Sequence, residues 1–250
     1  MQIGKGENFS PEYLTVNPAG TVPSLVSPSL ETPLTDSRDI LLFLDRSKTS
    51  RGKLYPSADE AGLKAKVDQL IEHIHSDPLS TNILLFLARD ESELNANKDF
   101  GRHNFLQGRQ SALEKYHDQV PNHSFYPGKK RENGSVHGAY VTEDKKALEE
   151  FFGMSNAAYD GLIKGLETLD TMLVLPYAAG ENVTAADFHI VPWLGHALMA
   201  VNESDIHNLD SLEAHLQKSS PSFKIGAKTR AWWAKANSIP SVKEFYPKPH

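Results

Sequence analysis

The amino-acid sequence predicts a mostly helical protein, with a short α+β part over residues 1–50 and a larger all-α part over residues 51–250. Alternating, strand-like runs bounded by turn residues occur in the first part. Apolar residues at helical spacing fill the second part. One run, Phe188–Ala200, is apolar on nearly every side, as in a helix buried at the centre of a domain.

The composition is that of an ordinary globular protein. The 250 residues are 39% hydrophobic and 23% charged, with a net charge of -6. Because there is no cysteine, disulfides, thiolate metal sites and thiol redox chemistry are excluded on this chain. The one compact basic cluster, Lys129–Arg131, lies among prolines and glycines, so no nucleic-acid partner is expected. No apolar run approaches the ~20 residues of a membrane span, and the start lacks a secretory signal, which predicts a cytoplasmic protein without a membrane partner.

The first part contains a predicted helix, a hairpin and a second helix. The helix over Glu7–Val16 must end before Pro18, because the residue before a proline is pushed out of the helical region. Val22–Val26 and Pro33–Thr35 are predicted to pair as the two strands of a hairpin. Asp36–Ser37 follows, and its side-chain oxygens are suited to cap the next helix.

The second part is predicted to begin with a helix from Asp59 that is bent or broken at Pro78 and continues to Leu87. Further helices are expected around Phe105–Tyr116 and over Leu148–Leu173. Between them, residues 118–142 are rich in proline and glycine and predict a long irregular insertion loop, a candidate lid.

A capping box at Thr184–Asp187 predicts the start of the buried helix, because the hydroxyl and the carboxylate each accept the other's backbone N–H. Pro192 lies inside this helix and should kink it. A last amphipathic helix is expected around Ala231–Trp233, ending before Pro240.

The histidines offer no convincing metal site. His73 and His75 are two residues apart, so they do not share a helix face and are predicted to be surface residues. His189 and His196 do share a face of the buried helix, and they are predicted to be interior histidines rather than a catalytic pair, because no carboxylate lies nearby in sequence. The sequence therefore predicts no bound metal.

Several of these motifs, in this order, resemble the glutathione transferase superfamily. Asn17–Leu25 resembles the segment that leads into the family's third strand, where the proline after a valine is held cis. Leu34–Ile40 resembles the family's acidic-residue-and-serine signature at the start of its third helix. Thr184–Asp187 resembles the capping box of its all-helical second domain. The resemblance implies a thioredoxin-like, glutathione-binding domain over residues 1–50 and the family's helical domain over residues 51–250.

The resemblance also implies that glutathione is the co-substrate, held by Val22, Pro23, Asp36 and Ser37. The backbone of Val22 would pair with the cysteinyl backbone of glutathione, and Pro23 would keep that backbone exposed. Asp36 and Ser37 would bind the γ-glutamyl end. Helix-end physics agrees, since a helix start favours a carboxylate and Asp36 offers a counter-charge to an ammonium group.

The sequence departs from the family at its start, because the family's first strand, first helix and second strand have no counterpart before Glu7. The tyrosine, serine or cysteine that acts on the glutathione sulfur lies in those elements, so the catalytic residue is unknown. Three explanations stay open: the helical domain stabilises a soft remnant, something such as another chain covers the open strand edge, or the sequence derives from a shortened gene model or splice form.

The expected function is that of a glutathione transferase acting on a small hydrophobic electrophile, in detoxification or secondary metabolism. A glutathione-dependent isomerase or dehydratase is one alternative, and a non-catalytic ligand-binding or scaffold protein is another. By resemblance the protein is expected to be a homodimer through the helices at Ile40–Leu44 and from Asp59 onward, with the latter also supplying an apolar second site.

Overall fold

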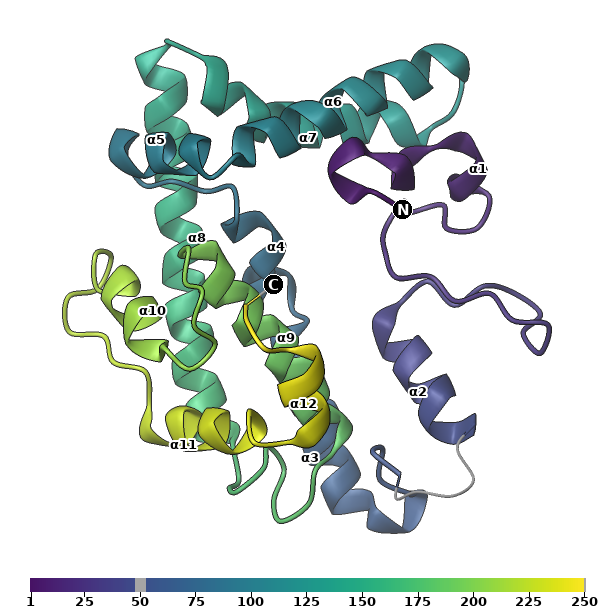
Figure 1. Ribbon diagram of the computed structural model, residues 1–250, viewed down its shortest axis with the longest axis vertical. Coiled ribbons are helices and arrows are strands. Elements are labelled where there is room, and N and C mark those ends of the chain that lie inside the picture. Colours follow the sequence, from purple (N-terminus) through teal and green to yellow (C-terminus); the bar gives the residue numbers. More distant parts are fainter. Residues whose placement is uncertain (48–52, 250) are drawn as a thin grey trace. The chain divides into compact units, whose positions relative to one another are not determined.

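The computed structural model describes residues 1–47 and 53–249, and it is mostly helical, as predicted (Figure 1). The described residues form two compact units. Residues 1–47 and 87–152 make up the first unit, and residues 53–86 and 153–249 make up the second. The boundary expected near residue 50 stays a prediction.

The amino-terminal helix is broken where a continuous one was predicted. The 3-10 helices η1 and η2 span Ile3–Lys5 and Glu7–Phe9, and α1 covers only Pro11–Leu14. Ser10 interrupts the helix because it precedes a proline and takes an extended conformation. Its hydroxyl then caps α1 by accepting from Tyr13 N at 3.2 Å.

The predicted hairpin is present in reduced form. Leu25 and Leu34 form one antiparallel pair, with N–H···O distances of 2.8 Å from Leu25 to Leu34 and 3.0 Å in return. Neither arm extends into a strand among the described residues, since prolines that cannot donate to a ladder, Pro23, Pro28 and Pro33, interrupt both arms and the tip. Helix α2, Ser37–Ser47, follows at the predicted position.

The irregular loop predicted over residues 118–142 is wrong, because most of it is helix α7, Phe125–Val141. Pro127 is tolerated since it is the third helical residue, where its missing N–H would have had no partner in the helix. The glycines that suggested a loop are helical. Buried Tyr126 and Tyr140 hold α7 in place despite them. Only residues 120–124 connect α7 to the preceding helix.

That preceding helix, α6, spans Arg102–Gln119 and pairs with α7 as an antiparallel helical hairpin (Figure 1). The Asn133 amide donates to Leu106 O at 3.1 Å and to Gln110 Oε1 at 2.9 Å. Lys130 Nζ lies 3.1 Å from His117 Nδ1. Residues later in α6 therefore contact residues earlier in α7, as in an antiparallel helix pair. Helix α5, Glu91–Asp99, packs on α6 and was not predicted.

The second unit confirms the helix break at Pro78. Helix α3, Ala61–Ile74, gives way to the 3-10 helix η4, Asp77–Leu79, and then to the short helix α4, Thr81–Leu84. Helix α8, Lys145–Met172, is the predicted long helix. The remaining helices of this unit are η3 at Ala58–Glu60, α9 at Ala185–Ala200, α10 at Leu209–Leu216, α11 at Ala227–Ala236 and α12 at Pro240–Phe245.

Helix α9 forms the core of the second unit, as predicted, and packs against α3 and α4. The capping box is present, and the fully buried Asp187 carboxylate accepts four hydrogen bonds. Its Oδ2 accepts from Thr184 N at 2.9 Å and Oγ1 at 3.2 Å, and its Oδ1 accepts from Ala178 N and Trp232 Nε1, each at 2.8 Å. This carboxylate therefore ties α9 to α11. No helix among the described residues is long and apolar enough to cross a membrane.

Candidate functional site

The four predicted ligand-binding residues lie where the two arms of the hairpin meet the rest of the first unit. Pro23 lies two residues before Leu25 and Asp36 lies two residues after Leu34. In the antiparallel register set by the Leu25–Leu34 pair, Pro23 is therefore opposite Asp36. Figure 1 shows the chain running out to the hairpin tip and back to the start of α2. The peptide bond between Val22 and Pro23 is cis, as the resemblance implied.

The backbone of Val22 is available to a ligand. Its side chain is 40% exposed, and its N–H and C=O make no hydrogen bond within the part of the chain that the structure describes. A backbone in this state offers one donor and one acceptor, which suits a peptide-like partner.

The start of α2 presents an acidic and a hydroxyl side chain. Asp36 is exposed, and its Oδ1 accepts from Arg38 N at 2.8 Å, which satisfies one of the free N–H groups of the first turn. Ser37 is half-buried, and within residues 1–47 and 53–249 its hydroxyl makes no hydrogen bond. A ligand's ammonium group could pair with the Asp36 carboxylate here. A ligand's carboxylate could accept hydrogen bonds from the helix start and the Ser37 hydroxyl.

Asn17 organises the loop that leads into Val22, and the sequence reasoning treated it only as a turn residue. Its side chain is 1% exposed, and its amide donates to Thr21 O at 2.8 Å, to Thr21 Oγ1 at 2.9 Å and to Ser24 Oγ at 3.2 Å. Its carbonyl oxygen accepts from Ala19 N at 3.0 Å. One buried side chain thus ties down the residues on either side of Val22 and Pro23.

Tyr13 of α1 holds the same two residues from a second direction. Its phenol donates to Thr21 O at 2.6 Å and lies 2.8 Å from Ser24 Oγ. These contacts span eight and eleven residues, so no local pattern in the sequence indicates them. Val22 and Pro23 are therefore held between two fixed neighbours.

The loop also rests on α7. The amide of buried Asn8 donates to Gly20 O at 2.6 Å. Gly20 has a φ of +62°, and a Cβ at this position would lie 2.7 Å from Phe125 Cζ. Below it, the Tyr126 phenol donates to Phe9 O at 2.8 Å within a cluster of buried residues. The site loop is thus built on the α6–α7 hairpin.

The histidines of the second unit are more connected than predicted. His75 Nε2 lies 2.9 Å from His189 Nδ1, and His189 Nε2 lies 3.1 Å from the Tyr55 phenol. His73 Nε2 lies 2.9 Å from Gly165 O. His75 is exposed, which confirms the prediction of a surface residue, and His73 is half-buried; the contacts of both rings were not predicted. The prediction of an interior His189 is confirmed, since it is 4% exposed.

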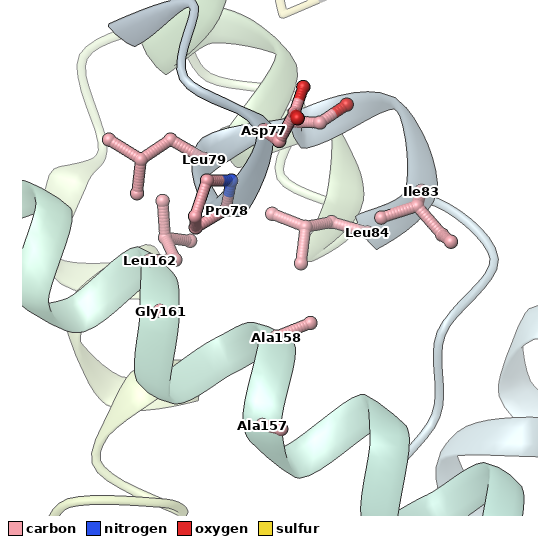
Figure 2. A pocket seen from close by; sticks show the side chains of 10 residues that line it. Asp77, Pro78, Leu79, Ile83, Leu84, Ala157, Ala158, Gly161 and Leu162 are labelled. Carbon is pink, nitrogen blue, oxygen red and sulfur yellow. The ribbon is translucent and has the colours of Figure 1, made fainter. Parts of the chain in front are cut away.

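The second unit also contains a cavity of about 290 Å³ beside α8 (Figure 2). Figure 2 shows Leu79 and Leu84 on one side and Ala158 and Gly161 of α8 on the other. Asp77 and Ser80 are its two polar lining residues. The lining is mostly apolar, and three of its four residues from α8, Ala157, Ala158 and Gly161, are small, which leaves room for the cavity.

Comparison with known proteins finds a family match at the start of the chain. Residues 2–47 match the family model described as "Glutathione S-transferase, N-terminal domain". No curated protein matches the chain. The solved structure of Gtt2 from Saccharomyces cerevisiae is 18% identical, with a TM-score of 0.52, and the match covers 98% of this chain and 84% of that one. This likeness shows a shared fold.

Two other solved structures resemble the chain more weakly. Maleylacetoacetate isomerase from Methylobacterium extorquens AM1, with bound malonate and GSH, is 17% identical at a TM-score of 0.49, covering 96% of this chain and 85% of that one. A Nilaparvata lugens delta-class glutathione transferase is 18% identical at a TM-score of 0.42, covering 95% and 84%.

Proposed function

From the match of residues 2–47 to the glutathione S-transferase N-terminal domain, we propose that this chain binds glutathione at Val22, Pro23, Asp36 and Ser37 and uses it on a small hydrophobic electrophile. The observation that carries the proposal is the unpaired backbone of Val22. It is held in place by Asn17 and Tyr13 and lies near the start of α2 along the hairpin register.

The donors and acceptors at this place fit the parts of glutathione. The Val22 N–H and C=O suit the cysteinyl backbone of the tripeptide. The γ-glutamyl end is a zwitterion, so its ammonium group suits the Asp36 carboxylate and its carboxylate suits the Ser37 hydroxyl and the start of α2. The chemistry of the site therefore supports recognition of an amino-acid zwitterion joined to a peptide.

In the transferase reaction the thiolate of glutathione attacks the electrophile. We assign no residue of this chain to the stabilisation of this thiolate, so the catalytic residue is unknown. Two alternatives use the same binding site: a glutathione-dependent isomerase or dehydratase, and a non-catalytic ligand-binding or scaffold protein. The apolar cavity at Pro78 belongs to the helices that we expect to contact a hydrophobic substrate. A cytoplasmic homodimer is part of the same proposal.

Calorimetric titration of glutathione into the chain and its Ser37→Ala variant tests the site. Loss of one hydrogen bond to a charged group costs about 1.5–3 kcal/mol, so affinity should fall by about tenfold or more. Ser47→Ala is the matched control, because Ser47 ends the same helix and its hydroxyl donates back to Phe43 O at 2.7 Å. Unchanged affinity in a folded Ser37→Ala variant would show that the site is misassigned.

A conjugation assay with a chromogenic electrophile separates the enzyme from the binding protein. A transferase turns over the electrophile at a rate that saturates with glutathione and falls in Ser37→Ala. A chain that binds glutathione in the titration without turnover supports the ligand-binding alternative instead.

A further inference from the structure

Two histidines of the α6–α7 hairpin lie together without hydrogen bonding. The rings of His103 on α6 and His137 on α7 have centroids 5.2 Å apart and planes inclined by 25°. Both residues belong to the first unit, and neither takes part in the proposed glutathione site. The erroneous loop prediction over residues 118–142 concealed this pair in the sequence.

Each ring has one orphaned nitrogen. His103 Nδ1 and His137 Nε2 are inaccessible to solvent, and within the described part of the chain they have no hydrogen-bond partner. A buried polar atom without a partner costs about 1–3 kcal/mol and is rare unless it holds a water or an ion. The His75–His189 pair is different, since its nitrogens lie at a hydrogen-bonding distance of 2.9 Å.

We propose that His103 and His137 bind one divalent transition-metal ion, such as Zn²⁺, through these two nitrogens. A zinc–nitrogen bond of about 2.1 Å places each imidazole centre about 3.2 Å from the ion. For an ion that lies in both ring planes and faces both nitrogens, centres 5.2 Å apart would subtend about 109°, the tetrahedral angle that Zn²⁺ prefers. The ring separation therefore fits two ligands of one tetrahedral site.

The donor set decides which ion this pair would take. Two imidazoles select Zn²⁺, Ni²⁺ or Cu²⁺ over Mg²⁺ and Ca²⁺, which prefer oxygen ligands.

The remaining coordination positions fall to water. Within residues 1–47 and 53–249, no group of three or more histidine, aspartate or glutamate side chains could hold a metal ion. The two helices are held in register near the pair by the Asn133 hydrogen bonds to Leu106 and Gln110. A site with two rigidly placed protein ligands and open positions binds more weakly than a closed structural zinc site.

Calorimetric titration of ZnCl₂ into the full chain, prepared without a histidine tag, tests the proposal. We expect one equivalent to bind and MgCl₂ to give no signal. His103→Gln and His137→Gln should each weaken zinc binding by about tenfold or more, since each removes a direct ligand. His207→Gln, at an exposed histidine of the second unit, is the matched control and should leave binding unchanged.

Thermal unfolding gives a second readout, because an ion that binds only the folded chain raises Tm, and the rise grows with the ion concentration relative to Kd. Zinc should raise the Tm of the unmodified chain and of His207→Gln, but not of the two hairpin variants, whose helical content is checked by circular dichroism. The proposal is overturned if the folded chain binds no zinc, or if binding survives in both His103→Gln and His137→Gln.

Discussion

The buried amide of Asn17 donates hydrogen bonds to both oxygens of Thr21, at 2.8 Å to the carbonyl and 2.9 Å to the hydroxyl. Thr21 immediately precedes the Val22–Pro23 pair, so this contact links a core side chain to the candidate glutathione site. The shape of the loop depends on Asn17 although Asn17 is not one of the proposed ligand-binding residues.

We expect Asn17→Ala to lower the free energy of unfolding by about 2 kcal/mol, because it removes several hydrogen bonds and leaves Ala19 N and the Thr21 carbonyl with fewer partners. Urea denaturation measures this loss. Glutathione affinity should also fall. Asn95→Ala, an exposed asparagine of α5, is the control, and an equal loss there would contradict the assigned role.

Gly20→Ala should destabilise the chain by about 1–2 kcal/mol from its φ of +62° alone, with a further loss from the approach to Phe125 at 2.7 Å. Phe125→Leu in the same background should recover the steric part, as a double-mutant cycle can measure. Gly138→Ala has open space around its Cβ within α7, so it should stabilise the chain by about 0.5–1 kcal/mol. Equal changes in the free energy of unfolding at both glycines would show that the backbone conformation and close contact at Gly20 are not what matters.

Asp187→Asn should cost about 3 kcal/mol, since the new amide group would face donors where the carboxylate accepts four hydrogen bonds. The exposed Asp160→Asn on α8 should change stability by less than about 0.5 kcal/mol. Equilibrium denaturation of both variants checks this. A small effect at Asp187 would mean that the capping box and the link to Trp232 contribute little.

The free energy of unfolding should fall as the pH drops through 6.5, the ordinary pKa of histidine, because the pKa of His137 is lowered in the folded chain. Below 6.5 His137 becomes protonated in the unfolded chain but stays neutral in the folded chain. The free energy of unfolding therefore keeps falling until the pH reaches the pKa of His137 in the folded chain. His137→Gln should flatten the profile measured by urea denaturation in metal-free buffer. The same slope in both proteins would assign the acid sensitivity to other groups.

The sequence predicted the elements whose signals are local. The capping box at Thr184–Asp187 and the apolar run behind it are complete within 17 residues, and the structure places α9 there. The same holds for α2, which begins at Ser37 as the Asp36–Ser37 cap indicated. Such signals need no knowledge of the rest of the fold.

The misses share a different cause, because tertiary contacts overrode the local signals. Pro127 and the glycines of α7 indicated a loop, yet Tyr126 and Tyr140 bury their rings against neighbours far away in sequence. The roles of Asn17 and Tyr13 in positioning the site were missed for the same reason. Val22, Pro23, Asp36 and Ser37 came from the family resemblance rather than from periodicity, and their role in binding stays a prediction.

The five-residue connection between α6 and α7 has a consequence for how the chain folds. Loop closure over so short a distance costs little entropy, so this helical hairpin can form before any long-range contact. Phe9 and Gly20 contact it across about a hundred residues, so we expect these contacts to form after the hairpin. The loop that carries Val22 therefore assembles on a surface that already exists, and slowing the hairpin would delay the site as well.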